Sequence, residues 1–294
     1  MDCIIFGGLV VDKYFDIEGY PDRGQDGFIT SEAAYVGGCA INIAATINNL
    51  GGRAHVVSYI GNDKTGEQIL KYLKTNGFSQ EFVKQTDGIS GYCLVFKEPD
   101  GERTFLTKKG VEGKFDPELL ENIDSIKSPI GAITGYYLLN EAAPIIMDCI
   151  EVMRVSGTKF IFDPGPLAGS IREDILKRMI KASSVVTPNE TEIEIFEKVQ
   201  PNFIESYVRS RGIVVLKKGA AGGRCYTRNG IFDYNSVKVD AVDTTGAGDS
   251  FTGALCYALG SGVDIKNAVD LASLCAAKTV QINAPHGFWN IKEV

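Results

Sequence analysis

The chain has 294 residues, of which 44% are hydrophobic and 23% are charged, as in an ordinary globular protein. Thirty basic and 37 acidic side chains give a net charge of −7 without any dense basic run, which argues against nucleic acid or an anionic membrane surface as a partner. The seven cysteines are scattered, form no CxxC pair and are odd in number, which predicts reduced thiols in a cytoplasmic protein.

The first apolar run, "CIIFGGLVV" at residues 3–11, is too short to span a bilayer and follows an acidic residue. We therefore expect neither a membrane span nor a signal peptide. The two histidines, His55 and His286, do not have the spacing of an HExxH zinc site.

Short β-rich runs alternate with helical patterns along the chain. Strands are expected near residues 3–8, 54–61, 131–137, 159–164, 184–189 and 212–219. Helices are expected near residues 40–50, 65–76, 142–155, 171–182, 191–198, 247–259 and 266–281. This alternation predicts a doubly wound α/β fold, with a mostly parallel central sheet and helices on both faces, built as one domain over residues 1–294.

Two regions interrupt this alternation. Residues 13–35 and 91–108 each look like a pair of strands joined by a turn, with "PDGE" as the second turn. Both leave the α/β core and return to it. We expect them to form a small β-sheet lid over the carboxyl edge of the main sheet, where open α/β folds bind their ligands.

The stretch "DTTGAGDSFTGALCYALG" at residues 243–260 places glycines directly before an apolar helical pattern. The small residues Gly246, Ala247 and Gly248 let a ligand approach the backbone, and the N-terminus of a helix attracts anions, which predicts a phosphate site. Asp249 has two interpretations. It is either a base that accepts a proton from an attacking hydroxyl or a plain N-terminal helix residue that complements the dipole.

The segment "YVGGCAINIAATINNLGG" at residues 35–52 repeats this glycine-then-helix pattern. Gly38 precedes the helix and Asn42 lies in its first turn, where an amide can both donate to and accept from a polyol hydroxyl. Asp12, in "GGLVVD", could hold two neighbouring hydroxyls. The alternatives are an ordinary solvated Asn42 and a surface carboxylate at Asp12.

Two further motifs follow predicted strands. In "TPNETE", Asn189 and Glu192 have the spacing of a capping box, and the alternative is a phosphate contact from Asn189 with Glu192 orienting water on Mg²⁺. In "VVLKKGAAGG", Lys217 or Lys218 could lie near phosphate above a flexible turn. Asp163, in "FDPGP", could line a site or only shape the exit from a strand.

Two motifs are absent from the sequence. It contains no GxxxxGK[ST], which excludes a P-loop enzyme, and no GxGxxG, which counts against a dehydrogenase.

The order of these motifs, a GG…N pair near the front, NxxE in the middle and DTTGAGDSFTGA near the end, resembles the ribokinase-like, PfkB-type carbohydrate kinases. The resemblance extends from "GGLVVD" to "QINAPHG". It implies a ribokinase-like fold, an ATP-dependent phosphotransferase activity on an alcohol acceptor, and Mg²⁺ as the metal.

The resemblance also implies catalytic, binding and metal-site roles for individual residues. Asp249 corresponds to the catalytic base, and Gly246, Ala247 and Gly248 to the anion hole. The sugar-holding positions correspond to Asp12, Gly38 and Asn42. The phosphate and Mg²⁺ motif corresponds to Asn189 and Glu192, and the nucleotide-binding turn to Lys217, Gly219 and Gly222. Positions beside a monovalent-cation loop, which would take K⁺, correspond to Asp243 and Thr245, with residues 283–287 nearby.

Three departures from the family pattern narrow these expectations. Lys217 stands where the family more often has Thr or Ser, "INAPHG" differs from the usual "GA" pattern of the cation loop, and "GGCAIN" differs from the "GGKGAN" of ribokinase. The second difference weakens the case for K⁺, and the third weakens ribose as the substrate.

We therefore expect a kinase that phosphorylates a primary hydroxyl of a sugar or sugar-like molecule. Alternatives are a nucleoside kinase, with Phe15, Tyr92 and Phe105 as an aromatic slot, and an inactive sugar-binding sensor. A phosphosugar acceptor would need a cation cluster, for which Arg103, Lys108 and Lys109 are the lid candidates. Two-stranded excursions bury too little surface to be stable alone, so we expect residues 13–35 and 91–108 to pair and their outer apolar side chains to pack on the lid of a second subunit. The resemblance also favours a homodimer.

Overall fold

The computed structural model describes residues 1–121, 123, 130–282, 284, 286 and 287. Within these residues, nine strands form one sheet in the order β13-β12-β11-β10-β9-β8-β1-β4-β5. The strands are β1 (Asp2–Phe6), β4 (Arg53–Gly61), β5 (Val83–Thr86), β8 (Ile130–Thr134), β9 (Lys159–Asp163), β10 (Val185–Val186), β11 (Ile213–Lys217), β12 (Gly223–Thr227) and β13 (Gly230–Tyr234). All neighbours from β5 to β11 are parallel, and β12 and β13 add an antiparallel edge.

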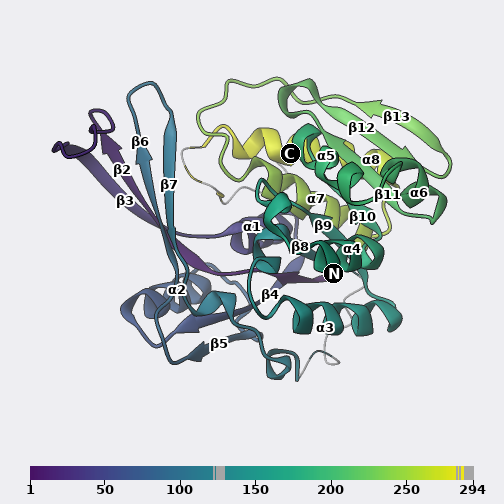
Figure 1. The fold of residues 1–294 in the computed structure, drawn as a ribbon, viewed down its shortest axis with the longest axis horizontal. Helices are drawn as coiled ribbons and strands as arrows, with labels where there is room; N and C mark the ends of the chain where they lie inside the picture. Colours follow the sequence, from purple (N-terminus) through teal and green to yellow (C-terminus); the bar gives the residue numbers. More distant parts are fainter. Residues whose placement is uncertain (122, 124–129, 283, 285, 288–294) are drawn as a thin grey trace.

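Helices cover both faces of this sheet (Figure 1). One face carries α1 (Cys39–Asn49), α2 (Lys64–Thr75), α7 (Ala247–Gly260) and α8 (Ile265–Thr279). The other carries α3 (Ala143–Val155), α4 (Glu173–Ala182), α5 (Glu190–Val199) and α6 (Phe203–Arg209). Strand β1 shows why both faces are needed, because Cys3 and Ile5 enter one core while Ile4 and Phe6 enter the other. The doubly wound α/β prediction is confirmed.

A separate four-stranded sheet projects from the main body as an arm at the left of Figure 1. Its order is β3-β2-β6-β7, with bounds β2 (Val10–Ile17), β3 (Ile29–Gly37), β6 (Tyr92–Lys97) and β7 (Arg103–Lys108). The two central strands, β2 and β6, are parallel, and the outer pairs are antiparallel. The two excursions predicted from the sequence therefore pair with each other.

The register divides the small sheet into two faces. Asp12 and Tyr14 lie on the same face as Arg103 and Phe105, and we call this the inner face because Arg103 reaches the main body. Phe15 and its neighbours Phe96, Leu94 and Leu106 lie on the opposite, outer face.

Of the three aromatic residues suggested for a nucleoside slot, only Phe105 is on the inner face. Phe15 and Tyr92 are on the outer face because side chains alternate along a strand.

Candidate active site

The carboxyl ends of the parallel strands and the mouth of α7 converge on one region. Gly246 is the N-cap of α7 and has a φ of 78°, a left-handed conformation that favours glycine. Ala247 and Gly248 form the first helical positions, and Asp249 follows in the first turn. Among the described residues outside α7, the Lys217 Nζ is the atom that a Cβ at Gly248 would meet within 4 Å, at 3.8 Å, so the helix mouth opens toward that cation. The positive end of the helix and the lysine together suit an anion.

Asp249 is a partly buried carboxylate held by helix α1. The Asn42 Nδ2 donates to Asp249 Oδ2 at 2.8 Å, and the Cys39 thiol also donates to this carboxylate. Burial raises the pKa of Asp249 to about 7, the nearby Asp163 adds to the rise, and the hydrogen bonds and Lys217 oppose it. A carboxylate whose pKa lies near neutrality is suited to proton transfer at physiological pH.

The other sugar-holding candidates lie close to this carboxylate. Asn42 is buried on α1, and Gly38 is the N-cap of that helix with a φ of 96°. The backbone N–H of Gly38 donates to the Asp12 carboxylate, while burial raises the pKa of Asp12 to about 6. A side chain at Gly37 would collide with the same carboxylate. The fold therefore places Asp12 of the small sheet against Gly38, whose carbonyl accepts from the Asn42 N–H in the first turn of α1 at 3.3 Å.

A cavity of about 620 Å³ opens next to the mouth of α7. Its walls include Gly219, Gly222, Ala247 and Gly248, with Lys217 at the end nearest Asp163. Most of the remaining wall is apolar and comes from α7, α8 and the segment after β13, namely Phe251, Ala276, Ala277, Val280, Val237 and Val239. The turn predicted to bind nucleotide thus lies beside the glycine-rich helix mouth.

Lys217 forms an ion pair with Asp163 at the carboxyl end of β9. The Nζ lies 3.0 Å from each oxygen of Asp163, whose Oδ2 also accepts from Thr252 at 2.8 Å. Lys217 is one-fifth exposed and Asp163 is almost fully buried. The ion pair fixes one cation at the anion site, at the position where the family more often has Thr or Ser.

Asn189 and Glu192 form the capping box of α5. The Asn189 Oδ1 accepts from the Glu192 N–H at 2.8 Å, and Glu192 Oε2 accepts from the Asn189 N–H at 2.9 Å. The Asn189 amide also donates to Glu192 Oε1 at 3.0 Å, so both carboxylate oxygens take part. Glu192 is buried, which raises its pKa, and Lys217 opposes that rise. In the described part of the chain, no cluster of three or more His, Cys, Asp or Glu side chains could hold a metal ion alone.

Arg103 contacts Asp243 and Thr245, the two residues suggested to lie beside a monovalent cation. Its Nη1 donates to Asp243 Oδ1 and to Thr245 Oγ1, each at 2.5 Å, and the Thr245 N–H also donates to Asp243 Oδ1 at 2.7 Å. The Asp243 side chain is 2% exposed. Because the guanidinium already neutralises this carboxylate, the observed arrangement does not fit an added K⁺. Residues 283 and 285 of the suggested cation loop lie outside the described residues.

Sequence reasoning did not anticipate several contacts in this region. Arg103 was considered only for a phosphosugar, yet it bridges the small sheet to the loop before α7. Cys39 and His286 approach the Asp249–Asn42 pair, and Tyr136 lies close enough for the Asp249 charge to raise its pKa, although burial raises it more. The only sequence signal for Cys39 is its position directly after Gly38. His286 lies in the segment 283–287 that the resemblance placed near the cation loop, but nothing in the sequence indicated its contact with Asn42, and no signal was available for Tyr136.

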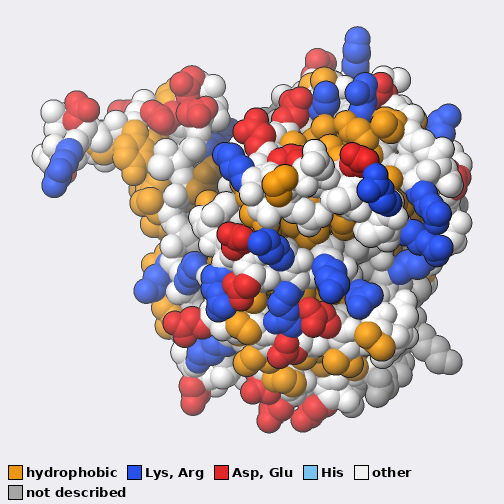
Figure 2. All heavy atoms as spheres, turned by 45° about the vertical axis from the view of Figure 1, so that its right-hand side comes forward, with side chains coloured by type: hydrophobic (Ala, Val, Ile, Leu, Met, Phe, Trp, Pro, Cys, Tyr) orange, Lys and Arg blue, Asp and Glu red, His pale blue; other side chains and the backbone are white. Residues whose placement is uncertain are grey.

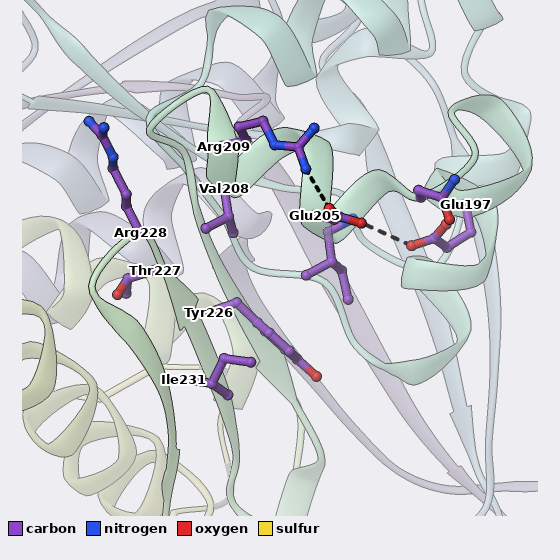
Figure 3. A pocket seen from close by; sticks show the side chains of 10 residues that line it. Glu197, Glu205, Val208, Arg209, Tyr226, Thr227, Arg228 and Ile231 are labelled. Carbon is purple, nitrogen blue, oxygen red and sulfur yellow. Dashed lines mark hydrogen bonds and ion pairs between the residues drawn. The ribbon is translucent and has the colours of Figure 1, made fainter.

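A second cavity lies between α6 and the strands β12 and β13 (Figure 3). Its carboxylates are already engaged, since Glu205 pairs with Arg209 and Glu197 accepts from the N–H groups of Phe203 and Ile204. None of the residues predicted for catalysis or binding lines it.

No described helix is long and apolar enough to cross a membrane.

The features around Asp249 suit the transfer of a phosphoryl group to an alcohol, because a partly buried carboxylate that can accept a proton directly follows a helix mouth that suits an anion. A family model for pfkB family carbohydrate kinases matches residues 9–285, and the chain belongs to that family. The sequence-based assignment is confirmed.

Relatives agree with this assignment. An uncharacterized sugar kinase, YegV, of Escherichia coli is 28% identical over 94% of this chain and 88% of its own length. A ribokinase of Staphylococcus aureus is 25% identical over 95% and 93%. A probable fructokinase-4 of Arabidopsis thaliana is 28% identical over 94% and 90%.

Solved structures share the fold. A nucleoside kinase of Burkholderia thailandensis in complex with inosine superimposes with a TM-score of 0.83 at 23% identity, covering 97% of this chain and 93% of that one. A Thermotoga maritima ribokinase gives 0.83 at 23% identity, covering 96% and 94%. The ribokinase-like fold is thereby established.

Proposed function

We propose that this protein transfers the γ-phosphoryl group of ATP to a primary hydroxyl of a sugar or sugar-like molecule. The observation that carries the proposal is the position of Asp249, a carboxylate with a pKa near neutrality that lies one residue beyond the glycine-lined mouth of α7. Asp12, Gly38 and Asn42 would hold the acceptor, and the cavity beside Lys217, Gly219 and Gly222 would hold the nucleotide.

The reaction requires one new bond and one broken bond. The acceptor oxygen bonds to the γ-phosphorus as the bond from that phosphorus to the β–γ bridging oxygen breaks, and ADP leaves. Asp249 takes the hydroxyl proton. The helix mouth at Gly246, Ala247 and Gly248, together with Lys217, stabilises the charge on the transferred group. Closure of the small sheet as a lid, held by Arg103, excludes water that would compete as an acceptor.

Mg²⁺ fits this site through water rather than through a protein cage. Glu192 offers hard carboxylate oxygens close to Lys217 and Asp163, while Asn189 contacts phosphate in this proposal. The ion, when bound, would neutralise charge on the phosphates. We include no K⁺, because Asp243 and Thr245 are engaged by Arg103.

A nucleoside acceptor is the second candidate. Three aromatic side chains lie on the inner face of the small sheet, where Tyr14 and Tyr35 pack edge to face with centroids 5.6 Å apart and Phe105 is half exposed. These rings could contact a base above the site. A phosphosugar acceptor is disfavoured, because Arg103 is already paired with Asp243 and Lys108 lies on the outer face opposite Tyr92.

The deciding experiment is an ADP-release assay of the purified protein with MgATP against a panel of sugars, sugar alcohols and nucleosides, with and without KCl. We expect turnover with a neutral polyol and no requirement for K⁺. Product identification by mass spectrometry should show one added phosphate. If no acceptor raises ADP release above the rate with water alone, the proposal is wrong.

Replacing Glu192 by Gln should raise the Mg²⁺ concentration that turnover requires while lowering the free energy of unfolding only slightly. Loss of the charge should raise the Mg²⁺ concentration needed for half-maximal turnover and lower kcat, measured by Mg²⁺ titration at fixed MgATP. Because Glu192 Oε1 also accepts from Asn189, the variant should lose about 1 kcal/mol of stability through its cap. Asp63→Asn, which weakens the cap of α2, is the matched control and should leave the Mg²⁺ curve unchanged. Superimposable curves for Glu192→Gln would leave this residue with a capping role only.

We also propose that the outer face of the small sheet joins two copies of the chain. Hydrophobic side chains are visible along the arm in Figure 2, and on the outer face Leu106 is half exposed beside Leu94 and Phe96. Sedimentation at micromolar concentration should therefore detect a dimer, and Leu106→Glu should yield monomers. The control is Val152→Glu on α3, a 66% exposed apolar position away from the arm. A wild-type protein that sediments as a monomer contradicts this proposal.

A further inference from the structure

Behind Asp249 runs a series of three side-chain hydrogen bonds that joins four parts of the chain. Asp249 on α7 accepts from the Asn42 amide on α1 at 2.8 Å. Asn42 Oδ1 lies 2.8 Å from the His286 Nδ1, in the segment after α8. The His286 Nε2 lies 2.5 Å from the hydroxyl of Tyr72 on α2.

Chemistry fixes the direction of every bond in this series. An ionised Asp249 only accepts, so the Asn42 nitrogen must face it and the Asn42 oxygen must face His286. That oxygen also only accepts, so His286 carries its proton on Nδ1. Burial lowers the pKa of His286 to about 4, which keeps the ring neutral and leaves Nε2 as an acceptor. Tyr72 must then donate, and burial keeps it protonated by raising its pKa to about 12.

Both outer members of the series are held in place by their neighbours. The Tyr72 ring stacks on Phe78, with centroids 6.0 Å apart, and meets the His286 ring edge to face at 5.9 Å. The Asn49 amide, about two helical turns beyond Asn42 on α1, donates to the Gly287 carbonyl at 2.7 Å. The imidazole therefore has a fixed position relative to α1.

The fixed imidazole of His286 controls which end of the Asn42 amide faces Asp249. The two ends of an asparagine amide have nearly the same shape, so Asn42 could turn over and place its oxygen against the Asp249 carboxylate. The Nδ1–H of His286 opposes this flip because it needs the Asn42 oxygen as its acceptor. We propose that His286 and Tyr72 are positioning residues that keep the Asn42 amide donating to the catalytic base.

This inference rests on the proposed role of Asp249 and predicts an effect on its proton affinity. The Asn42 hydrogen bond lowers the pKa of Asp249 against the effect of burial. The other groups that act on this carboxylate or respond to its charge are Asp163 on β9, Lys217 on β11, Cys39 on α1 and Tyr136 after β8. Among the described residues, the side-chain partners of His286 in this series are Asn42 and Tyr72. Loss of His286 should therefore raise the pKa of the base without changing those neighbours.

The hydrogen-bond series can be tested first without any enzyme assay. The chain contains only two histidines, so a protein labelled with ¹⁵N-histidine gives two sets of ring signals, and His286→Ala assigns them. We expect the His286 ring to stay neutral and protonated at Nδ1 across about pH 5 to 8, where a free imidazole titrates. An Nε2-protonated ring, or ordinary titration in that range, would overturn the proposal whatever the protein phosphorylates.

The second test is the pH dependence of kcat/KM. In His286→Ala the acidic limb should move up by about one pH unit, which lowers the rate on that limb about tenfold. Tyr72→Phe should move it less, because the ring remains. His286→Asn should restore most of the wild-type profile, since its amide nitrogen can take the place of Nδ1–H. Melting temperatures separate these effects from unfolding.

A merely structural role for His286 would lower stability and leave the acidic limb where it is, and that result contradicts the proposal. If the wild-type protein phosphorylates no acceptor in the panel, the proposed function fails while the imidazole spectra still decide whether the series exists. The two failures are therefore distinguishable.

Discussion

Asp249→Asn is expected to lower kcat by roughly 10²–10⁴-fold, the usual contribution of a positioned base. The amide has the shape of the carboxylate and can still accept from the Asn42 Nδ2, so the fold and the glycine-lined helix mouth should survive. Nucleotide binding, measured by calorimetry, should remain close to that of the wild type. Near-normal turnover would remove Asp249 from this role.

The pH profile provides a check on the same variant. Because burial raises the pKa of Asp249 to about 7, the wild-type carboxylate is protonated, and unable to accept a proton, at lower pH. The wild-type kcat/KM should therefore fall as the pH decreases through about 7, and the residual rate of Asp249→Asn should lose this limb. Asp12→Asn is the matched control, because a residue that only holds the acceptor should raise the KM for the acceptor and keep the limb near pH 7.

Gly248→Val should impair the use of ATP by roughly 10²–10³-fold in kcat/KM, comparable to the loss of a main anion-hole donor. A Cβ at this position would face Lys217 Nζ at 3.8 Å, so the branched side chain would fill the space between the helix mouth and that cation. Gly248 has no positive φ, and the substitution should leave the backbone unstrained. Acceptor binding, measured by calorimetry without nucleotide, should be nearly unchanged.

Gly248→Ala is the matched control for this effect. A methyl group at 3.8 Å from Lys217 Nζ is in ordinary contact, so this variant should keep much of the activity. Circular dichroism and melting temperature must show that both variants are folded. If Gly248→Val handles ATP like the wild type, the loop does not contact phosphate.

Local pattern was enough to predict most of the secondary structure. Apolar periodicity placed seven of the helices within a few residues of their observed bounds, because the buried face of a helix repeats along the sequence. The helix α6 was missed because its seven residues are too few to show such a period. The hairpin of β12 and β13 was also missed, although Asn229-Gly230 is a recognised turn signal that sequence reasoning overlooked.

The sequence by itself determined the family, the α/β fold with its small sheet, and the motifs that carry Asp249, Asn42 and Glu192, because each depends on residues close together in the chain. Only the tertiary structure decided which of these groups meet. Asn42 and Asp249 are 207 positions apart, Arg103 and Asp243 are 140 apart, and Asn42 and His286 are 244 apart. Such contacts arise where different strands and helices end at the same edge of the sheet, and no local spacing encodes them. Tertiary structure also decided that Phe15 and Tyr92 share the outer face, because the register between β2 and β6 sets which of their alternating side chains lie on the same side of the sheet.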